Sequence, residues 1–460
     1  MKASSVLVHP SSYRDPAGFL FFRDGVLYRQ VNKVFRTAFD SFINDGLYQH
    51  LVDNSLLISH QLIGENLTGS PDWYATLMPE TIPFVSYPYE WCFDMLKDAA
   101  LLTLESTTEA IKYGMILKDA SAYNIQLHKG HMIFIDTLSF EPFDETKPWK
   151  AYRQFSEHFF APLALMHYLK KPLQTLFLAY PDGIPLDLAS TLLPLKSRLN
   201  LHTYLHIHLQ ASLSRKAAPQ QNNTSSSFSK KKMLHLLQSL KEKIQSFSLM
   251  QSPTVWSTYY REAGERGNYL SSKKQIVHGW LSRLNFKTVL DAGANEGEFS
   301  EIAANNSAYV ISADLDHSSV NTLYNKVKRQ EIKNICPLII DFANTSPAIG
   351  VNNEERTSFL KRIKVDLILA LALVHHLVLG KNVPFEKIAS MFSSMTHYLL
   401  IEFIPRSDEK VSILSENKKE LLLSYSEEIF VNSFQEYFSI LERREIENTG
   451  RTLYLMENRH

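Results

Sequence analysis

The sequence predicts a two-domain protein of the α/β class, with an open parallel sheet in the C-terminal half and a smaller α+β domain before it. Two observations predict the sheet: four short apolar runs that each end in polar residues, and a glycine-containing turn after the first run. A third observation separates the domains. Residues 212–232 combine Ser, Asn, Gln and a basic cluster with almost no apolar side chains, which is typical of a flexible linker.

The glycine-containing turn follows the first apolar run. Residues 289–299 read VLDAGANEGEF, so Asp291, Gly293, Asn295 and Gly297 lie between an expected strand and an expected helix. Glycine at such a junction lets the backbone come close to a bound nucleoside, because a Cβ would block both the turn and the ligand. The pattern predicts a nucleoside-binding turn, although taken alone it also fits an ordinary strand-to-helix connection.

Polar residues also end the next three apolar runs. Because the carboxyl ends of parallel strands meet at one edge of a sheet, we expect these side chains to lie beside the glycine turn. A carboxylate after the second strand is placed to accept hydrogen bonds from both ribose hydroxyls of a nucleoside. The runs and their polar residues are 309–316 with Asp314 and Asp316, 335–340 with Asp341 and Phe342, and 365–372 with His375 and His376.

In order and spacing, these motifs resemble those of class I S-adenosylmethionine-dependent methyltransferases. The resemblance implies a Rossmann-like seven-stranded methyltransferase sheet, with a fifth strand at 395–404 and an antiparallel edge pair at 437–441 and 451–456. One departure is Asn295, which replaces the usual middle glycine. A plain NAD-binding Rossmann domain is the main rival, and the segment after the fourth strand favours the methyltransferase.

The resemblance implies S-adenosylmethionine as the cofactor and assigns a part of it to each motif. Gly293 and Gly297 would leave room for the methionyl group and the adenosine. Asp291 would fix the turn or meet the methionyl amino group through water. Asp314 is the first candidate for binding the ribose, and Asp316 is the second. Asp341 would accept from the adenine amino group, and Phe342 would lie against the ring. The implied cofactor residues are Asp291, Gly293, Asn295, Gly297, Asp314, Asp316, Asp341 and Phe342.

His375 and His376 are the titratable pair expected near the transferable methyl group. A sulfonium methyl is already activated, so catalysis needs mainly positioning, with a base only where the acceptor must lose a proton. An imidazole with a pKa near 6.5 can take that proton at neutral pH, giving an acidic limb near pH 6 to 7. We expect His376 to have this catalytic role, whereas His375 equally fits a helix cap.

The segment around these histidines also predicts the class of acceptor. Methyltransferases that act on amino groups of DNA and RNA commonly carry Asn/Asp-Pro-Pro-aromatic at this position, to grip a planar base. Residues 373–377 read LVHHL instead, which resembles enzymes that act on small molecules, lipids or sugars. Aromatic residues at 256–260 are placed by the resemblance near the methionyl end of the cofactor or the acceptor, or against the sheet.

The N-terminal domain carries a second motif. Residues 18–29 predict a β-hairpin with an Asp-Gly turn. Farther on, Asp119, Asn124 and Asp136 resemble the catalytic base and the magnesium-binding residues of protein kinases and small-molecule phosphotransferases. The match is short, its flanking residues depart from the usual ones, and no glycine-rich nucleotide loop precedes it. A turn acid and a capping asparagine are the alternative.

The predicted domains are an N-terminal α+β domain at 1–211 with a kinase-like loop, the linker at 212–232, and the methyltransferase domain at 233–460. The layout of the whole chain resembles bacterial two-part methyltransferases named as host-specific nodulation proteins, which hints at a small-molecule or glycan-like acceptor. Two alternatives stay open. One is a phosphotransferase in the first domain, and the other is a scaffold that binds the cofactor without catalysis.

Composition narrows the class of partner. The chain has 460 residues with 48 basic and 48 acidic side chains, so it has no overall electrostatic field that would attract nucleic acid. Nucleic acid is therefore not expected as a partner, and only a local basic patch remains as an alternative. Two cysteines far apart suggest neither a disulfide framework nor a metal site, and we expect a cytoplasmic protein. No apolar run is long enough to span a membrane. The sequence makes no prediction of the oligomeric state.

Overall fold

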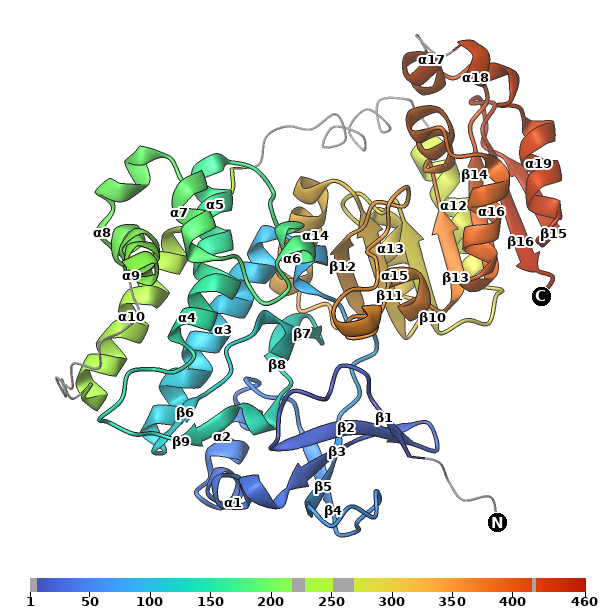
Figure 1. Cartoon of the computed structure of the whole chain (residues 1–460). Helices are drawn as coiled ribbons and strands as arrows, with labels where there is room; N and C mark the ends of the chain where they lie inside the picture. Colours follow the sequence, from blue (N-terminus) through green and yellow to red (C-terminus); the bar gives the residue numbers. More distant parts are fainter. Residues whose placement is uncertain (1–5, 217–227, 251–268, 416–418) are drawn as a thin grey trace. The chain divides into compact units, whose positions relative to one another are not determined.

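The computed structural model describes residues 6–216, 228–250, 269–415 and 419–460. The chain divides into two compact units, each built around its own sheet (Figure 1). Unit 1 comprises Met1–Met250 with Ala348–Arg356, and unit 2 comprises Gln251–Pro347 with Thr357–His460.

Unit 1 begins with a five-stranded antiparallel sheet in the order β1-β2-β3-β5-β4. The expected hairpin is present as β2 and β3, and Asp24 and Gly25 join the strands with φ of 52° and 78°. Positive φ at both positions is the type I′ turn that matches the twist of the flanking strands. Phe39 and Leu77, the latter on β5, belong to the buried core of this sheet. The strands are β1 (Leu7–Val8), β2 (Gly18–Arg23), β3 (Val26–Asn32), β4 (His60–Ile63) and β5 (Trp73–Pro79).

The rest of unit 1 is mainly helical and packs around the long helix α3 (Phe93–Lys112), which is buried over much of its length. Two short two-stranded sheets follow this helix: β6 (Met115–Leu117) with β9 (Phe140–Pro142), and β7 (Ile125–His128) with β8 (His131–Phe134). The helices of unit 1 are α1 (Arg36–Asn44), α2 (Leu47–Asp53), α4 (Tyr152–Phe155), α5 (Ala161–Leu169), α6 (Leu176–Ala179), α7 (Leu186–Leu192), α8 (Leu201–Thr203), α9 (Gln210–Lys216) and α10 (Lys230–Ser246).

Helix α10 corrects the predicted domain boundary at residue 233. Its apolar residues recur at helical spacing and are fully buried within unit 1, where the helix packs against α3. Lys97 of α3 also donates to the carbonyl oxygens of Gln245 and Phe247, at 2.8 Å each. Unit 1 therefore extends to Met250, and the first residues of the predicted linker are helical as the end of α9. The buried residues of α10 are Met233, Leu237, Leu240 and Ile244.

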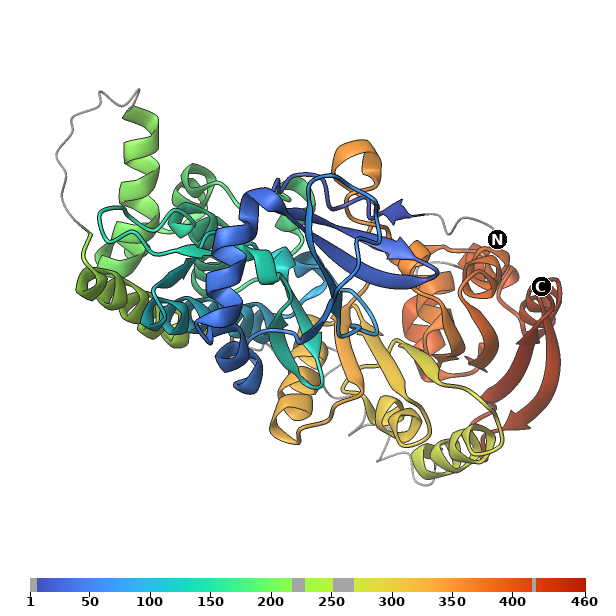
Figure 2. The same ribbon diagram turned by 90° about the horizontal axis from the view of Figure 1, so that it is seen from below.

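Unit 2 contains the predicted Rossmann-like seven-stranded sheet. The strand order is β12-β11-β10-β13-β14-β16-β15, in which the first five strands are parallel and β16 is antiparallel to both neighbours (Figures 1 and 2). The strands are β10 (Thr288–Ala292), β11 (Tyr309–Asp314), β12 (Ile335–Ile339), β13 (Val365–Ala370), β14 (Thr396–Phe403), β15 (Phe438–Glu445) and β16 (Thr452–Asn458).

The position of β10 in this sheet determines where a ligand can bind. β10 pairs with β11 on one side and β13 on the other, so the chain reverses its direction of progress through the sheet beside β10. Open α/β sheets bind ligands at this switch point, beyond the carboxyl ends of the strands. The helices of unit 2 are α12 (Tyr269–Leu281), α13 (Glu298–Ala304), α14 (His317–Arg329), α15 (Phe359–Arg362), α16 (Phe385–Ser393), α17 (Glu409–Ser415), α18 (Lys419–Leu423) and α19 (Glu427–Gln435).

Candidate functional site

The turn after β10 has the backbone conformation that its sequence predicts. Gly293, Asn295 and Gly297 have φ of 79°, 50° and 85°, all in the left-handed region. Asparagine is one of the few residues besides glycine that adopt this region readily, which explains why Asn295 can replace the usual glycine. A Cβ on Gly297 would lie 2.5 Å from a methyl carbon of Leu323, so glycine is required there for space as well as for φ.

Asp314, at the end of β11, holds this turn in place. One carboxylate oxygen accepts from the backbone N–H of Asn295 at 2.8 Å, and the other accepts from the N–H of Asp316 at 2.8 Å. Burial raises the pKa of Asp314, while these backbone donors oppose the rise. Asp316 caps α14 by accepting from the N–H of Ser319 at 3.0 Å and from its hydroxyl at 2.7 Å. Both acids therefore already have a structural role.

Asp291, the last acid of β10, connects three elements. Its Oδ2 accepts from the hydroxyl of Ser300 on α13 at 2.6 Å, and Ser300 Oγ lies 2.7 Å from Ser312 Oγ on β11. Burial raises the pKa of Asp291 to about 6, against the hydrogen bond from Ser300. These contacts fit the expectation that this acid fixes the turn.

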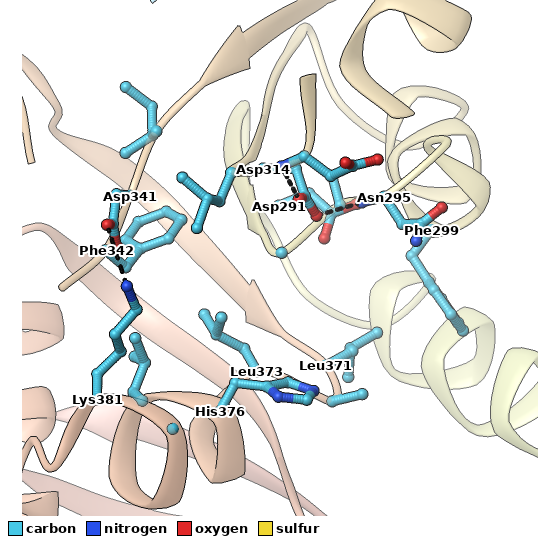
Figure 3. Close-up of a pocket in the computed structure, with 18 of the residues that line it drawn as sticks. Asp291, Asn295, Phe299, Asp314, Asp341, Phe342, Leu371, Leu373, His376 and Lys381 are labelled. Atoms are coloured by element: carbon cyan, nitrogen blue, oxygen red, sulfur yellow. Dashed lines mark hydrogen bonds and ion pairs between the residues drawn. The ribbon is translucent and has the colours of Figure 1, made fainter. Parts of the chain in front are cut away.

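A cavity of about 370 Å³ lies at the carboxyl ends of β10, β11, β12 and β13 (Figure 3). Its volume is within the range of cofactor sites. The cavity brings together predicted residues from all four strand ends, whereas Gly297 and His375 do not line it. The predicted residues in its lining are Asp291, Gly293, Asn295, Asp314, Asp316, Asp341, Phe342 and His376.

His375 and His376 lie side by side after β13, with ring centroids 3.8 Å apart. Burial lowers the pKa of His376 to about 4, and the charges of Lys410 and Arg451 act in the same direction. Burial also lowers the pKa of His375 well below its usual value, and His375 Nδ1 has no hydrogen-bond partner in the described part of the chain. Both rings are neutral at neutral pH, so the acidic limb expected at pH 6 to 7 moves toward pH 4.

Comparisons with known proteins gave no matching family model. The nodulation protein NoeA of Rhizobium meliloti strain 1021 is 28% identical over 97% of this chain and 95% of its own length. The structure of the N-methyltransferase NodS from Bradyrhizobium japonicum WM9 is 13% identical and covers 42% of this chain and 98% of its own, with a TM-score of 0.32. The structure of magnesium protoporphyrin IX methyltransferase from Synechocystis PCC 6803, with bound SAH, is 16% identical. It covers 45% of this chain and 90% of its own, with a TM-score of 0.28.

The order of the seven strands decides the fold, because five parallel strands are followed by an antiparallel edge pair and the glycine turn lies at the switch point. Unit 2 has the strand order of the class I S-adenosylmethionine-dependent methyltransferase fold. The predicted fold class of this half of the chain is confirmed. The aromatic residues expected at 256–260 lie outside the described residues.

Lys273 of α12 is a site residue that the motif analysis missed. It lines the cavity, and its Nζ lies 4.9 Å from the ring centroid of Phe299, a second missed residue. The signal was present in the helical spacing, because Tyr269, Lys273, Val277 and Trp280 are all buried on one face of α12. A lysine on an otherwise apolar helix face requires a buried anionic partner.

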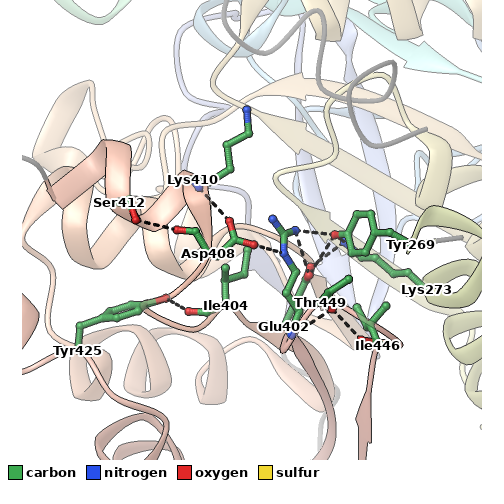
Figure 4. A network of polar contacts seen from close by, with 11 residues as sticks. Tyr269, Lys273, Glu402, Ile404, Asp408, Lys410, Ser412, Tyr425, Ile446 and Thr449 are labelled. Atoms are coloured by element: carbon green, nitrogen blue, oxygen red, sulfur yellow. Dashed lines mark hydrogen bonds and ion pairs between the residues drawn. The ribbon is translucent and has the colours of Figure 1, made fainter. Parts of the chain in front are cut away.

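That partner is Glu402, at the carboxyl end of β14 (Figure 4). Lys273 Nζ lies 2.7 Å from Glu402 Oε2, and Tyr269 donates to Oε1 at 3.2 Å. Arg451 donates to the Tyr269 hydroxyl at 2.7 Å and to Asp408 at 2.8 Å. Burial alone would raise the pKa of Glu402, but Lys273 and Arg451 bring it below its usual value. Two cations and two anions thus balance one another around one end of the cavity.

Lys381 is a second missed cation, and it lies at the other end of the cavity. Its Nζ is 3.8 Å from Asp341 Oδ2, beside Phe342 (Figure 3). Between the two ends, one wall of the cavity is mainly apolar, with leucines from the segment after β13 and from α17. No short motif marks these residues, because they come from elements far apart in the sequence. The apolar lining residues include Leu371, Leu373, Leu377 and Leu414.

The kinase-like residues of unit 1 also lie close together. Asp136 Oδ1 is 2.8 Å from a guanidinium nitrogen of Arg29 on β3, and its other oxygen accepts from the hydroxyl of Ser139. Asn124 donates to that same hydroxyl at 3.4 Å. Arg29 is a basic partner that no local motif marks, because it lies far before Asp136 in the sequence. The positive charge beside Asp136 is therefore an arginine of the chain itself.

Asp119, the acid expected to act as base, is held by its neighbours as well. Its Oδ1 accepts from the side chain of Gln154 at 2.7 Å and from the N–H of Ser121 at 3.1 Å. Burial and the nearby charge of Asp136 raise the pKa of Asp119. Within the described ranges, no group of three or more His, Cys, Asp or Glu side chains is close enough to hold a metal ion.

Proposed function

We propose that the chain transfers the methyl group of S-adenosylmethionine to a small-molecule, lipid or glycan-like acceptor. The observation that carries this proposal is the single cavity that is lined both by the expected cofactor residues and by His376. When bound, the cofactor supplies an activated methyl group, so the chain has mainly to orient two reactants and exclude water. A concave, largely apolar cavity of about 370 Å³ suits this task.

The lining residues fit the cofactor from end to end. Asp341 and Phe342 would hold the adenine by a hydrogen bond and a ring contact, and Asp314 or Asp316 would accept from the ribose hydroxyls. At the other end, Lys273 would meet the methionyl carboxylate, because it is the cation of the lining nearest to Asp291 and Phe299. Its partner Glu402 holds the ammonium group in place without neutralising all of its donors.

The acceptor class is proposed from the segment after β13. Leu373, Leu377 and Leu414 give this part of the cavity an apolar wall, and His376 is the polar group within it. A small acceptor with an apolar body and one hydroxyl or amine suits such a wall.

His376 would act mainly by orienting the acceptor. Its neutral ring accepts a hydrogen bond from the attacking hydroxyl or amine, which points the nucleophile at the methyl group. With a pKa of about 4 it is a weak base, so the proton leaves during or after transfer and passes on to water.

A screen with labelled methyl donor tests this proposal on the whole chain. Amino sugars, oligosaccharides, lipids and small amines form one panel, and RNA and DNA form the other. We expect label in at least one member of the first panel and none in the second. Label only in nucleic acid would contradict the acceptor class. Cofactor binding with no label in any acceptor would favour the scaffold alternative.

A further inference from the structure

Unit 1 exposes a group of large apolar side chains, here called the leucine patch, on consecutive elements from α7 to α9. Figure 1 shows α7, α8 and α9 grouped together in green. Isolated apolar residues on a surface are ordinary, but a contiguous group marks an interaction site. Leu195 and Leu199 expose 80% and 89% of their surface, values close to those of an unfolded chain. The leucine patch is Leu192, Leu195, Leu199, Leu201, Tyr204, Leu205 and Leu213.

The elements that carry the leucine patch are well packed on their other faces. Ser197, His206 and His208 are buried, and both ring nitrogens of His208 lie 2.8 Å from serine hydroxyls, those of Ser190 and Ser197. His206 Nδ1 lies 2.6 Å from the hydroxyl of Tyr152. The same elements also bury Leu193, Ile207 and Ala211, so their inner face is an ordinary packed one. The exposed leucines form a second, outer apolar face that an apolar partner would cover.

The charge of the same region indicates that the partner carries negative charge. Residues 188–241 contain no Asp or Glu, in a chain whose basic and acidic residues are equal in number overall. Lys196 and Arg198 are exposed between Leu195 and Leu199. Two exposed leucines therefore flank two cations on one short 3-10 helix, Leu195–Leu199. The basic residues of this region are Lys196, Arg198, Arg215, Lys216, Lys230, Lys231, Lys232 and Lys241.

We propose that the leucine patch binds the surface of an anionic lipid membrane. Exposed leucines on such a surface enter the boundary between lipid headgroups and acyl chains, while neighbouring Lys and Arg side chains attract anionic headgroups. A second copy of the chain fits less well, because pairing two such patches would bring like charges together. Nucleic acid would use the cations but leave the leucines in water. In the described ranges, no helix is both long and apolar enough to cross a bilayer, so the binding is peripheral.

Vesicle flotation with the full chain tests this inference independently of the methyltransferase proposal. We expect the chain to float with vesicles of phosphatidylcholine containing phosphatidylglycerol, and about tenfold less with phosphatidylcholine alone. The variant Leu195→Ser/Leu199→Ser should lose about tenfold in bound fraction at unchanged circular dichroism and thermal stability. Lys196→Glu/Arg198→Glu should lose at least as much, and high salt should weaken the parent chain.

Leu62→Ser is the matched control, because Leu62 is 64% exposed on β4 of the same unit, outside the leucine patch. It should float as the parent chain does. Equal flotation of the parent and of both patch variants would overturn the inference, as would absence of flotation with every vesicle. A dimer that is lost in the leucine variant without any effect of lipid would assign the leucine patch to a second copy instead.

Discussion

Each unit of this chain gathers aspartates at the ends of strands, but the two groups are used differently. In unit 2, Asp291, Asp314 and Asp341 border a cavity of about 370 Å³. In unit 1, Asp136 is paired with Arg29 at 2.8 Å and Asp119 accepts from Gln154 at 2.7 Å. The acids of unit 2 also bond to groups of the chain, but they line a space that a ligand can enter, whereas Asp136 of unit 1 is paired with an arginine of the chain itself.

The difference shows what a motif of acids needs before it becomes a site. A turn with left-handed residues brings backbone close to a ligand and leaves room for it, as at Gly293 and Asn295. A metal ion at Asp136 would first have to displace a guanidinium group. We therefore propose that the kinase-like loop of unit 1 has a structural or regulatory role without phosphoryl transfer.

The largest expected effect concerns the stability of unit 1. Asp136→Ala leaves Arg29 without its carboxylate in a largely buried position, so unfolding should become easier by about 3 kcal/mol. Urea denaturation of the full chain measures this effect, and the cofactor affinity of unit 2 should not change. The matched control is Asp24→Asn, at the exposed tip of the β2–β3 hairpin, where asparagine also adopts the φ of 52°, and it should cost less than about 0.5 kcal/mol. An unchanged midpoint for Asp136→Ala would mean that the pair is not structural.

The next effect concerns the acid that holds the glycine turn. Asp314→Ala removes the acceptor of the Asn295 N–H and the proposed ribose ligand, so affinity for S-adenosylmethionine should fall by about 1.5 to 3 kcal/mol. Isothermal titration calorimetry measures it, with Asp136→Ala as the variant that leaves this affinity intact. A larger loss for Asp316→Ala than for Asp314→Ala would reverse the roles of the two acids.

His376 should affect turnover more than binding. His376→Ala is expected to leave cofactor affinity within about threefold and to cut turnover at least tenfold, once an acceptor is known. Because burial lowers the pKa of His376 to about 4, its neutral form persists from neutral pH down to that value. The rate should therefore stay level from pH 8 to 5 and fall only as the pH approaches 4.

The lowered pKa of His376 also makes the stability of the folded chain depend on pH. His376 has a pKa near 6.5 in the unfolded chain and about 4 in the folded one, so its contribution is complete above 6.5 and is lost as the pH falls toward 4. The stability of His376→Ala should accordingly depend less on pH in that window. A parent rate with its midpoint at pH 6 to 7, or equal loss of binding and turnover in the variant, would contradict this account of the site.

The smallest effect is expected at the position that departs from the usual glycine pattern. Asn295→Gly keeps the left-handed conformation, so cofactor affinity should stay within about twofold. Asn295→Val, with a β-branched side chain at φ of 50°, should bind clearly more weakly. Calorimetry on both variants checks the pair. Equal affinities would show that the turn conformation is not what the site requires.

The sequence predicted the sheet of unit 2 well because buried parallel strands are continuous apolar runs, and each strand end was marked by a polar residue. Eight of the residues it predicted line the cavity, whereas Gly297 and His375 do not. It could not predict Arg29 beside Asp136 or Lys273 beside Glu402, since these partners are far apart in the chain. The expected boundary at 233 failed because α10 begins with lysines but buries Met233 and Leu237 in unit 1.

The pKa of His376 and the exposure of Leu199 lay beyond sequence reasoning for a related reason. Both depend on what surrounds the side chain after folding. The histidine is shielded from water and lies near the charges of Lys410 and Arg451, whereas the leucine lies on the outer face of a short helix whose serine points inward. A local pattern contains neither fact.

The most direct test of the central claim is a calorimetric titration of the folded full chain with S-adenosylmethionine. The cavity at the glycine turn predicts one binding site per chain, and the site should weaken in Asp314→Ala and stay unchanged in Asp136→Ala. No heat and no thermal shift at millimolar cofactor would contradict the claim, as would equal losses in both variants.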